Sequence, residues 1–262
     1  MTTTDTTQVR DFWESRARAV ANDGEVTHSD VWQRWLEIET IKRFLSGSDR
    51  AIDVGCGNGY ATRQIGPLVR RILGIDYTEA MIERAIGSPA GDRTGTGNVE
   101  FAVCDVLELE PERFGLFDVA VSARCLINLA SWDDQKRAIA NIGGVLREGG
   151  RFLFIEGSAD ARLRLNELRE SVGLEAMPPV WYNVNFDESE LLSFLDEHFV
   201  VEQRLNFGVY DLISRVAHPL MVAPEKPNYR SRINEVAARL ALRSDACGDI
   251  SRVIFLVLRK KP

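Results

Sequence analysis

The stretch "AIDVGCGNGYATRQI", residues 51–65, places three glycines directly behind a short apolar run. The run predicts a buried strand over 50–54, and the residues that follow the glycines predict a helix over 59–66. A sharp turn from a strand into a helix presents backbone N–H groups and the positive end of the helix at one edge of the sheet. Glycines at this turn allow unusual backbone angles and a close approach of a ligand to the main chain. The stretch therefore predicts a shelf for a cofactor.

The spacing of the glycines discriminates between cofactors. A dinucleotide fingerprint, GxGxxG, would require glycine at position 60, where this chain has Tyr60. The chain instead has the pattern DxGxGxG, in which Asp53 precedes Gly55, Gly57 and Gly59. A carboxylate at this place would repel a pyrophosphate but attract a ligand that carries an ammonium group. The pattern favours a ligand that bears an ammonium group over a dinucleotide.

Two further acids stand where the next strands end. Asp76 closes the strand predicted over 71–76, and Asp105 follows the strand predicted over 99–104. A carboxylate at the end of the second strand can accept hydrogen bonds from the hydroxyls of a ribose. Asp105 could meet the amino group of an adenine. The acids thus predict a nucleoside beside the glycine turn.

The rest of the chain continues the alternation of strands and helices, which predicts an α/β fold with a parallel sheet and helices on both faces. Residues 7–46 are predicted helical. About 45 residues separate the last two predicted strands, and an insertion of this length predicts a lid or a wall of the acceptor site. The other predicted strands are 117–122, 151–156, 199–205 and 252–258, the other helices are 78–86, 133–147, 160–172, 187–197 and 229–243, and a surface loop is predicted over 87–98.

Composition limits the classes of partner and site. The 262 residues carry a formal net charge of −7, which argues against a nucleic acid partner because phosphate binding needs clustered Lys and Arg. No apolar run approaches the roughly 20 residues that span a bilayer, and the N-terminus lacks the pattern of a secretory signal. The four cysteines form no CxxC pair, so buried thiols are expected rather than metal ligands. We expect a cytoplasmic enzyme with no metal, no membrane partner and no nucleic acid partner.

Several stretches, taken together, resemble the successive motifs of class I S-adenosylmethionine-dependent methyltransferases of the small-molecule, type 11/25-like kind. They are "AIDVGCGNGYATRQI", "RILGIDYTEAMIERA", "VCDVLEL" and "FDVAVSARCLINLASWDDQKRAIANIGGVLREGGRFLFIEG". The resemblance is continuous across residues 50–158. It implies a Rossmann-like, doubly wound, seven-stranded sheet whose last strand is antiparallel. The single domain would comprise a helical lid at 1–46, a cofactor-binding core at 47–158 and an acceptor-site region at 159–262.

The resemblance also implies which residues hold S-adenosylmethionine and its product S-adenosylhomocysteine. The methionine portion would lie on the backbone of Gly55, Cys56 and Gly57, with Asp53 near its ammonium. Asp76 would hold the ribose. The remaining cofactor residues would be Tyr77 and Met81 beside the adenosine, Asp105 and Val106 around the adenine, Ser122 at the reactive end, and Trp13 and Arg16 facing the methionine end from the first helix. For Tyr77 and Met81, plain core packing is an equal alternative.

The acceptor is less well defined by the sequence. No Asn-Pro-Pro-Tyr-like motif follows the fourth strand, which argues against DNA or protein glutamine as acceptor. Arg124 stands there and could bind an anionic acceptor, since a guanidinium suits a carboxylate or a phosphate; an ion pair with an acid of a neighbouring helix is the alternative. His218 is the candidate base, because imidazole titrates near neutrality, although a hydrogen-bonded loop histidine is the alternative. Tyr210 and Arg124 complete the catalytic candidates, and the acceptor-binding candidates are Arg124, Asn128, Asn166, Arg169, Tyr182, Asn183, Tyr210 and Arg215.

These observations predict an enzyme that transfers a methyl group to an O or N nucleophile of a small polar or acidic biosynthetic metabolite. The transfer is an in-line displacement, so alignment of the partners does most of the catalytic work. Two alternatives are kept: a methyltransferase acting on RNA or protein, and a module that binds S-adenosylmethionine without catalysis. A homodimer is left open.

Overall fold

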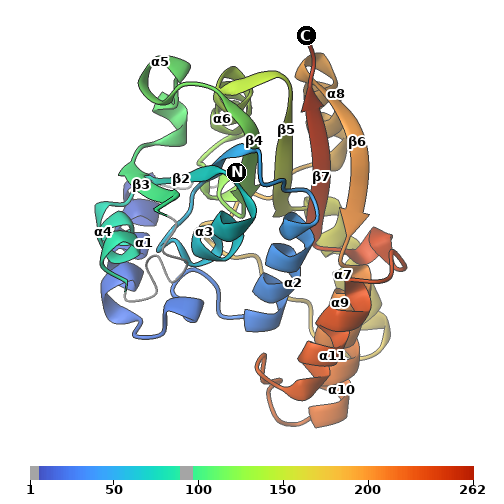
Figure 1. Ribbon diagram of the computed structural model, residues 1–262. Coiled ribbons are helices and arrows are strands. Elements are labelled where there is room, and N and C mark those ends of the chain that lie inside the picture. Colours follow the sequence, from blue (N-terminus) through green and yellow to red (C-terminus); the bar gives the residue numbers. More distant parts are fainter. Residues whose placement is uncertain (1–5, 89–96) are drawn as a thin grey trace.

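The glycine turn lies at the centre of a seven-stranded sheet with the order β3-β2-β1-β4-β5-β7-β6. The chain is seen here in a computed structural model that describes residues 6–88 and 97–262 (Figure 1). β7 runs antiparallel to both of its neighbours, and the other pairs are parallel, which confirms the predicted fold class. The strands are β1 (Arg50–Val54), β2 (Arg71–Asp76), β3 (Val99–Val103), β4 (Phe117–Ala123), β5 (Leu146–Gly157), β6 (Phe199–Asn206) and β7 (Val253–Lys260).

The helices fill the connections between these strands. The longer ones are α1 (Thr6–Ala19), α2 (Val31–Lys42), α4 (Glu79–Gly87), α6 (Trp132–Gly144), α7 (Ala159–Ser171), α8 (Glu188–His198) and α11 (Arg232–Ala241). The shorter ones are α3 (Tyr60–Ile65), α5 (Pro111–Phe114), α9 (Gly208–Asp211) and α10 (His218–Val222). The 3-10 turns are η1 (Asp23–Glu25), η2 (Gly66–Leu68), η3 (Val106–Glu108), η4 (Leu126–Asn128) and η6 (Gly248–Ile250), and η5 (Leu212–Ala217) is a π-helix.

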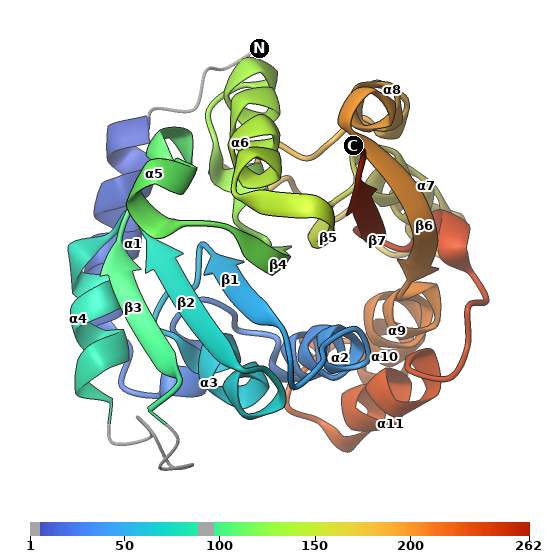
Figure 2. The same cartoon turned by 45° about the horizontal axis from the view of Figure 1, so that its top comes forward.

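Hydrophobic cores cover both faces of the sheet because successive residues of a strand point to opposite faces. In β1, Ile52 packs with α6 and α8 on one face, whereas Ala51 packs with α2, α3 and α11 on the other. Figure 2 shows these two helical layers on either side of the curved sheet. The alternation fixes the register of β1 and thereby places Asp53 and the turn after it at the carboxyl edge of the sheet.

The region predicted to be helical over 7–46 forms two helices, α1 and α2, separated by a turn. Asn22 caps η1 by accepting a hydrogen bond from the N–H of Gly24, and Asp30 caps α2 by accepting one from the N–H of Gln33. Short polar side chains at such positions satisfy N–H groups that a helix start leaves free, and so they begin a new helix. The segment between α1 and α2 contacts the glycine turn.

The predicted insertion contains α9, η5, α10, α11 and η6 and lies beyond the carboxyl ends of the parallel strands (Figure 1). This is the edge at which α/β sheets bind ligands. Of the surface loop predicted over 87–98, residues 89–96 lie outside the described residues.

Candidate active site

All three glycines of the turn adopt left-handed backbone angles, with φ of +72° at Gly55, +53° at Gly57 and +69° at Gly59. The N–H groups of Gly55 and Cys56 donate to the carbonyl of Ile75 at 2.8 and 2.9 Å, and that of Gly57 donates to Asp76 Oδ2 at 3.0 Å. The amides that the sequence suggested as a shelf are therefore already paired. This differs from a phosphate-binding turn, whose amides face the ligand, and it suits a ligand that is not an anion at this point.

The segment between α1 and α2 covers the turn. A Cβ at Gly57 would lie 2.5 Å from Thr27 Cγ2, so only glycine lets this segment come so close. Asn58 Nδ2 donates to the carbonyl of Asp23 at 3.0 Å. The guanidinium of Arg34 lies 4.2 Å from the centroid of the Tyr60 ring and donates to the carbonyl of Gly24. These contacts bind the N-terminal segment to the sheet edge.

A cavity opens between this segment and the strand ends. The expected cofactor and acceptor residues that line it are Trp13, Asp53, Gly55, Cys56, Gly57, Asp76, Tyr77, Met81, Asp105, Val106, Arg124 and Asn128. Its further lining includes Thr6, Thr27, His28, Arg34, Glu37, Cys104 and Cys125. The ends of β1, β2, β3 and β4 therefore meet α1 and α2 at a single site.

Asp53 and Asp76 are buried carboxylates in the wall of the cavity, 4% and 9% exposed. Thr62 Oγ1 donates to Asp53 at 2.6 Å, and the N–H groups of Gly57 and Thr78 donate to Asp76 at 3.0 and 2.9 Å. Burial raises the pKa of Asp53 to about 6, against the opposing effects of Thr62 and Arg34. Burial also raises the pKa of Asp76, against the hydrogen bonds from Thr78 and Gly57. Both groups would gain from a ligand that donates hydrogen bonds or carries positive charge.

The cavity continues over the ends of β2 and β3. Met81 is 1% exposed and packs with Ala17 and Val26 of the N-terminal segment, and Arg10 of α1 lies 4.9 Å from the centroid of the Tyr77 ring. Asp105 caps η3 by accepting from the N–H of Leu107 at 2.9 Å. Tyr77 and Met81 thus both line the cavity and pack against α1 or its neighbours. A contact with the cofactor and a role in packing are therefore compatible for these two residues.

The turn after β4 brings Arg124 and Asn128 to the cavity. Arg124 has a φ of +57°, an unusual angle for a residue with a side chain, and residues held in such angles cluster at functional sites. Its Nε donates to Glu37 Oε1 of α2 at 3.0 Å, and its carbonyl accepts from Asn128 Nδ2. Trp13 Nε1 of α1 donates to Asn128 Oδ1 at 3.1 Å. The helix acid anticipated as a partner of Arg124 is therefore Glu37.

Comparison with known proteins agrees with this geometry. A family model described as a methyltransferase domain matches residues 45–197, which is more than half of the chain. The chain belongs to this family. The resemblance to class I S-adenosylmethionine-dependent methyltransferases is thereby confirmed.

Individual relatives are similar over part or all of the fold. The O-methyltransferase cnsE of Penicillium expansum is 30% identical over 150 residues, which are 57% of this chain and 50% of that protein. The chain spans about half the length of the curated relatives it matches. Magnesium protoporphyrin IX methyltransferase from Synechocystis PCC 6803, solved with S-adenosylhomocysteine, is 15% identical with a TM-score of 0.63 and coverage of 98% of this chain and 100% of that one. The N-methyltransferase NodS from Bradyrhizobium japonicum WM9 is 19% identical, with a TM-score of 0.53 and coverage of 96% and 98%.

In this methyltransferase domain, a buried glutamate that the sequence analysis missed organises the turn after β4. Glu156 of β5 accepts hydrogen bonds from the N–H groups of residues 125–127 and from Ser122 Oγ at 2.7 Å. Burial raises its pKa to about 7 against these hydrogen bonds. Ser122 is fully buried and its hydroxyl donates to Glu156, and it is not among the described residues that line the cavity. An acid inside an apolar strand was the signal that could have identified Glu156.

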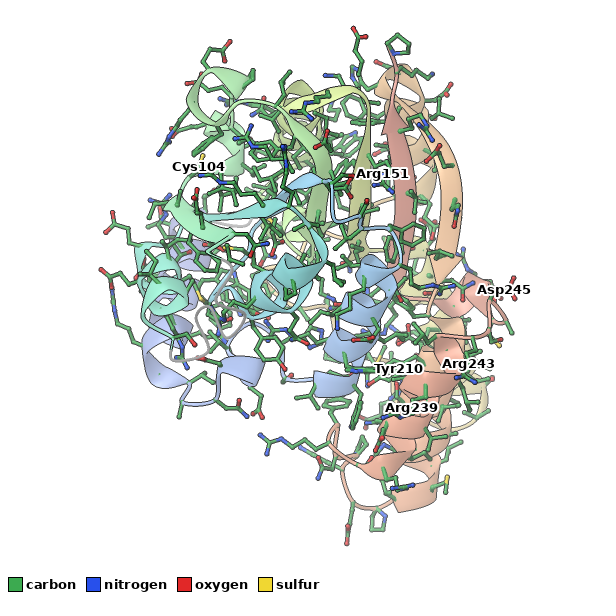
Figure 3. All side chains as sticks on the ribbon, viewed as in Figure 1. Cys104, Arg151, Tyr210, Arg239, Arg243 and Asp245 are labelled. Atoms are coloured by element: carbon green, nitrogen blue, oxygen red, sulfur yellow. The ribbon has the colours of Figure 1, made fainter. Side chains whose placement is uncertain are left out.

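Tyr210 and Arg215 do not line the cavity as it is formed by the described residues. Tyr210 is fully buried in the side of the C-terminal helices that faces α2 (Figure 3), and its hydroxyl donates to Asp30 Oδ1 at 2.5 Å. Arg215 forms a buried ion pair with the other oxygen of Asp30. Burial and Asp30 raise the pKa of Tyr210, which keeps the phenol protonated. The expected positions of both residues at the acceptor are corrected: they hold the start of α2.

His218 also lies away from the lining that the described residues form. It is 4% exposed, and its Nε2 lies 3.5 Å from Ser231 Oγ just before α11. The position of His218 therefore agrees with the alternative, a hydrogen-bonded histidine, and not with a base at the cavity. The sequence could not show this, because His218 follows the irregular helix η5 and its partner Ser231 lies 13 positions further along the chain.

The remaining candidates, Arg16, Asn166, Arg169, Tyr182 and Asn183, are not among the residues that line the cavity in the described part of the chain. Arg16 donates to the carbonyls of Glu25 and Val26 and so shapes the covering segment. Tyr182 stacks on Phe12 of α1 with ring centroids 4.7 Å apart. Asn166 bonds to the backbone of Met177, Arg169 bonds to the carbonyls of Glu175 and Arg215, and the N–H of Asn183 donates to the carbonyl of Val180.

The described residues contain no group of three or more His, Cys, Asp or Glu side chains arranged to hold a metal ion. Within the same ranges, none of the helices combines the length and the hydrophobicity required to cross a lipid bilayer.

Proposed function

We propose that this domain transfers a methyl group from S-adenosylmethionine to an O or N nucleophile of a small polar or acidic metabolite. The observation that carries the proposal is the pair of buried carboxylates, Asp53 and Asp76, which flank one glycine turn in the wall of the cavity. Arg124, in its left-handed conformation, lines the same cavity and gives the acceptor an anion-binding group.

The residues present fit the cofactor. Among the described residues the carboxylate of Asp53 accepts one hydrogen bond, from Thr62, and this buried group suits the ammonium of the methionine portion. Each oxygen of Asp76 accepts one amide and retains a lone pair for a ribose hydroxyl. A Cβ at Gly55 would lie 2.4 Å from Cys125 Sγ, so glycine keeps the backbone close to the floor of the cavity.

Bound S-adenosylmethionine supplies an electrophilic methyl group on a sulfonium. The protein contributes position and exclusion of water. The segment between α1 and α2 covers the glycine turn, and the hydrogen bond from Trp13 to Asn128 ties α1 to the turn after β4. Holding the acceptor in line with the methyl group can contribute about 7–11 kcal/mol, so the reaction needs no strong base when the nucleophile is already deprotonated.

The proposal is tested with purified protein and methyl-labelled S-adenosylmethionine in a cell extract. We expect the label to move into the small-molecule fraction and not into RNA or protein. Label recovered only in polymer would support the macromolecular alternative. Binding of S-adenosylhomocysteine without any transfer would support the non-catalytic alternative.

The raised pKa of Asp53 predicts how cofactor binding depends on pH. Above about pH 7 the carboxylate is ionised and can pair with the ammonium of S-adenosylhomocysteine. As the pH falls through about 6, protonation competes with binding, and the affinity should fall by up to tenfold per pH unit. The stability of the folded protein depends on pH in the opposite sense. Because folding raises the pKa of Asp53 from 3.8 to about 6, folding disfavours the ionised form of this group. Protonation of Asp53 therefore adds stability as the pH falls from about 6 towards 4.

Isothermal titration calorimetry with S-adenosylhomocysteine measures how the affinity depends on pH. The titrations should cover roughly pH 5 to pH 8, the range in which Asp53 changes its protonation state. Asp53→Asn keeps the shape and the hydrogen bond from Thr62 but cannot ionise. We expect weaker binding by this variant at pH 8 and a smaller change in affinity with pH than in the unmodified chain, in which Asp53 and Asp76 both titrate. An unaltered pH dependence in Asp53→Asn would remove this residue from the ammonium site.

A further inference from the structure

The turn after β4 contains a cradle of backbone N–H groups. Arg124 is left-handed, with a φ of +57°, and Cys125 is right-handed, with a φ of −94° and a ψ of −51°. Successive residues of opposite hand turn their N–H groups to one side and form a concave site for an anion. The anion that the N–H groups of residues 125–127 meet is the carboxylate of Glu156 on β5.

Glu156 fills this cradle with both of its oxygens. Oε1 accepts from the N–H groups of Cys125 and Leu126 at 3.2 and 3.0 Å and from Ser122 Oγ at 2.7 Å. Oε2 accepts from the N–H of Ile127 at 3.3 Å. An ionised carboxylate only accepts hydrogen bonds, so it suits four donors, and bonds to a charged acceptor are stronger than those between neutral groups. Glu156 is fully buried and is not among the described residues that line the cavity, so it can act there only through the turn.

The same turn carries the contacts that reach the cavity and the N-terminal helices. Arg124 and Asn128 both line the cavity. Asn128 Nδ2 donates to the carbonyl of Arg124 at 2.8 Å, and Asn128 Oδ1 accepts from Trp13 Nε1 of α1 at 3.1 Å. Arg124 Nε donates to Glu37 of α2 at 3.0 Å. A change in the backbone of the turn would therefore alter the contacts with both helices and move Arg124 and Asn128.

We propose that Glu156 is a positioning residue of the acceptor site, whose carboxylate holds Arg124 in its left-handed conformation and presents Arg124 and Asn128 to the cavity. This inference rests on the proposed function, which assigns the turn to the acceptor. Glu156 acts through the backbone of residues 124–128. Without its carboxylate, three buried N–H groups would lose their acceptor, which favours a rearrangement that pairs them elsewhere.

Other contacts of the turn bind its carbonyl groups. Gln135 Nε2 donates to the carbonyl of Leu126 at 3.1 Å, and the N–H of Val184 donates to the carbonyl of Ile127 at 2.6 Å. These contacts attach the turn to the rest of the fold but provide no acceptor for its N–H groups. Substitution of Glu156 should therefore leave the turn attached and change its backbone angles locally.

The indole N–H of Trp13 reports the position of the turn without any ligand. Its signal in ¹H–¹⁵N spectra is identified by its loss in Trp13→Phe, and Asn128→Ala gives the signal of an indole that lacks this acceptor. Burial raises the pKa of Glu156 to about 7, so the spectra are recorded at about pH 8, where the carboxylate is mostly ionised. In Glu156→Gln, a side chain of the same shape has only one accepting oxygen and turns N–H bonds towards other donors. We expect the Trp13 signal of this variant to lie nearer to that of Asn128→Ala than to that of the unmodified chain.

Two variants are the controls. Ser122→Ala removes one donor but leaves the three backbone bonds, and Glu148→Gln makes the same change at an exposed glutamate of β5. Both should keep the Trp13 signal of the unmodified chain. If Glu156 only stabilised the fold, Glu156→Gln would have a lower Tm and an unmoved Trp13 signal, and this result would overturn the inference.

Glu156→Asp covers the case in which Glu156→Gln does not fold. The shorter side chain keeps the charge but withdraws the oxygens from the turn, so the Trp13 signal should again move towards that of Asn128→Ala. An unmoved signal in this variant would likewise count against the positioning role.

Transfer of labelled methyl groups gives a second readout. A displacement of about 1 Å can slow a reaction about 100-fold, so we expect Glu156→Gln to transfer methyl groups roughly 10–100-fold more slowly. Its affinity for S-adenosylhomocysteine should change by less than about threefold, because the lost interaction belongs to the alignment of the acceptor. An unchanged rate in a folded Glu156→Gln protein would overturn the inference. Absence of transfer by the unmodified chain would instead overturn the proposed function, and the Trp13 signal would still decide whether Glu156 positions the turn.

Discussion

Asp76→Ala is expected to weaken binding of S-adenosylhomocysteine by about 3 kcal/mol, roughly 100-fold. Charge-assisted hydrogen bonds contribute about 1.5–3 kcal/mol each, and the substitution would remove those to the ribose. It also leaves the N–H groups of Gly57 and Thr78 without their acceptor, so the glycine turn itself loses support. Isothermal titration calorimetry measures the loss, with thermal unfolding as a check that the variant folds.

Two further variants make this result specific. Asp133→Ala removes an acid whose side chain is 88% exposed at the start of α6, and its affinity should match that of the unmodified chain. Asp76→Asn retains one acceptor oxygen and should fall between the two. Wild-type affinity in a folded Asp76→Ala protein would show that the ribose is held elsewhere.

Gly55→Ala is expected to lower the free energy of unfolding by about 2–5 kcal/mol. The φ of +72° alone disfavours a side chain by about 1–2 kcal/mol. The new Cβ would also lie 2.4 Å from both Cβ and Sγ of Cys125, and such overpacking costs a further 1–3 kcal/mol or so. Urea denaturation measures the difference.

The chain provides a matched control for this substitution. Gly149 has a nearly equal φ of +69°, but nothing lies within 4 Å of a Cβ placed there. Gly149→Ala should therefore show only the backbone effect, about 1–2 kcal/mol. Removing the clash with Cys125→Gly should recover part of the loss in Gly55→Ala. Equal losses at the two glycines, with no recovery, would mean that the contact with Cys125 has no energetic importance.

The features predicted well from the sequence are those set by local pattern. Gly55, Gly57 and Asp76 stand at the ends of strands that short apolar runs identify, and parallel strands bring their carboxyl ends to one edge. The number of strands and the antiparallel β7 followed from the resemblance. Twelve expected site residues consequently line one cavity.

The features that were missed depend on contacts between residues far apart in the chain. Glu37 and Arg124 are 87 positions apart, and Asp30 and Tyr210 are 180 apart, so no spacing in the sequence joins them. Tyr210 and His218 are chemically suited to catalysis, but residue type does not show which way a side chain points from an irregular helix. His28 also lines the cavity, and the sequence could not single it out because other elements close the cavity around it.

The triple attachment of Asp30 has a mechanical consequence. An outward movement of residues 22–30 would have to separate Asp30 from Tyr210 and Arg215, or to move α9 and η5 with it. Movement of residues 22–30 to admit a ligand would then be coupled to displacement of the C-terminal helices.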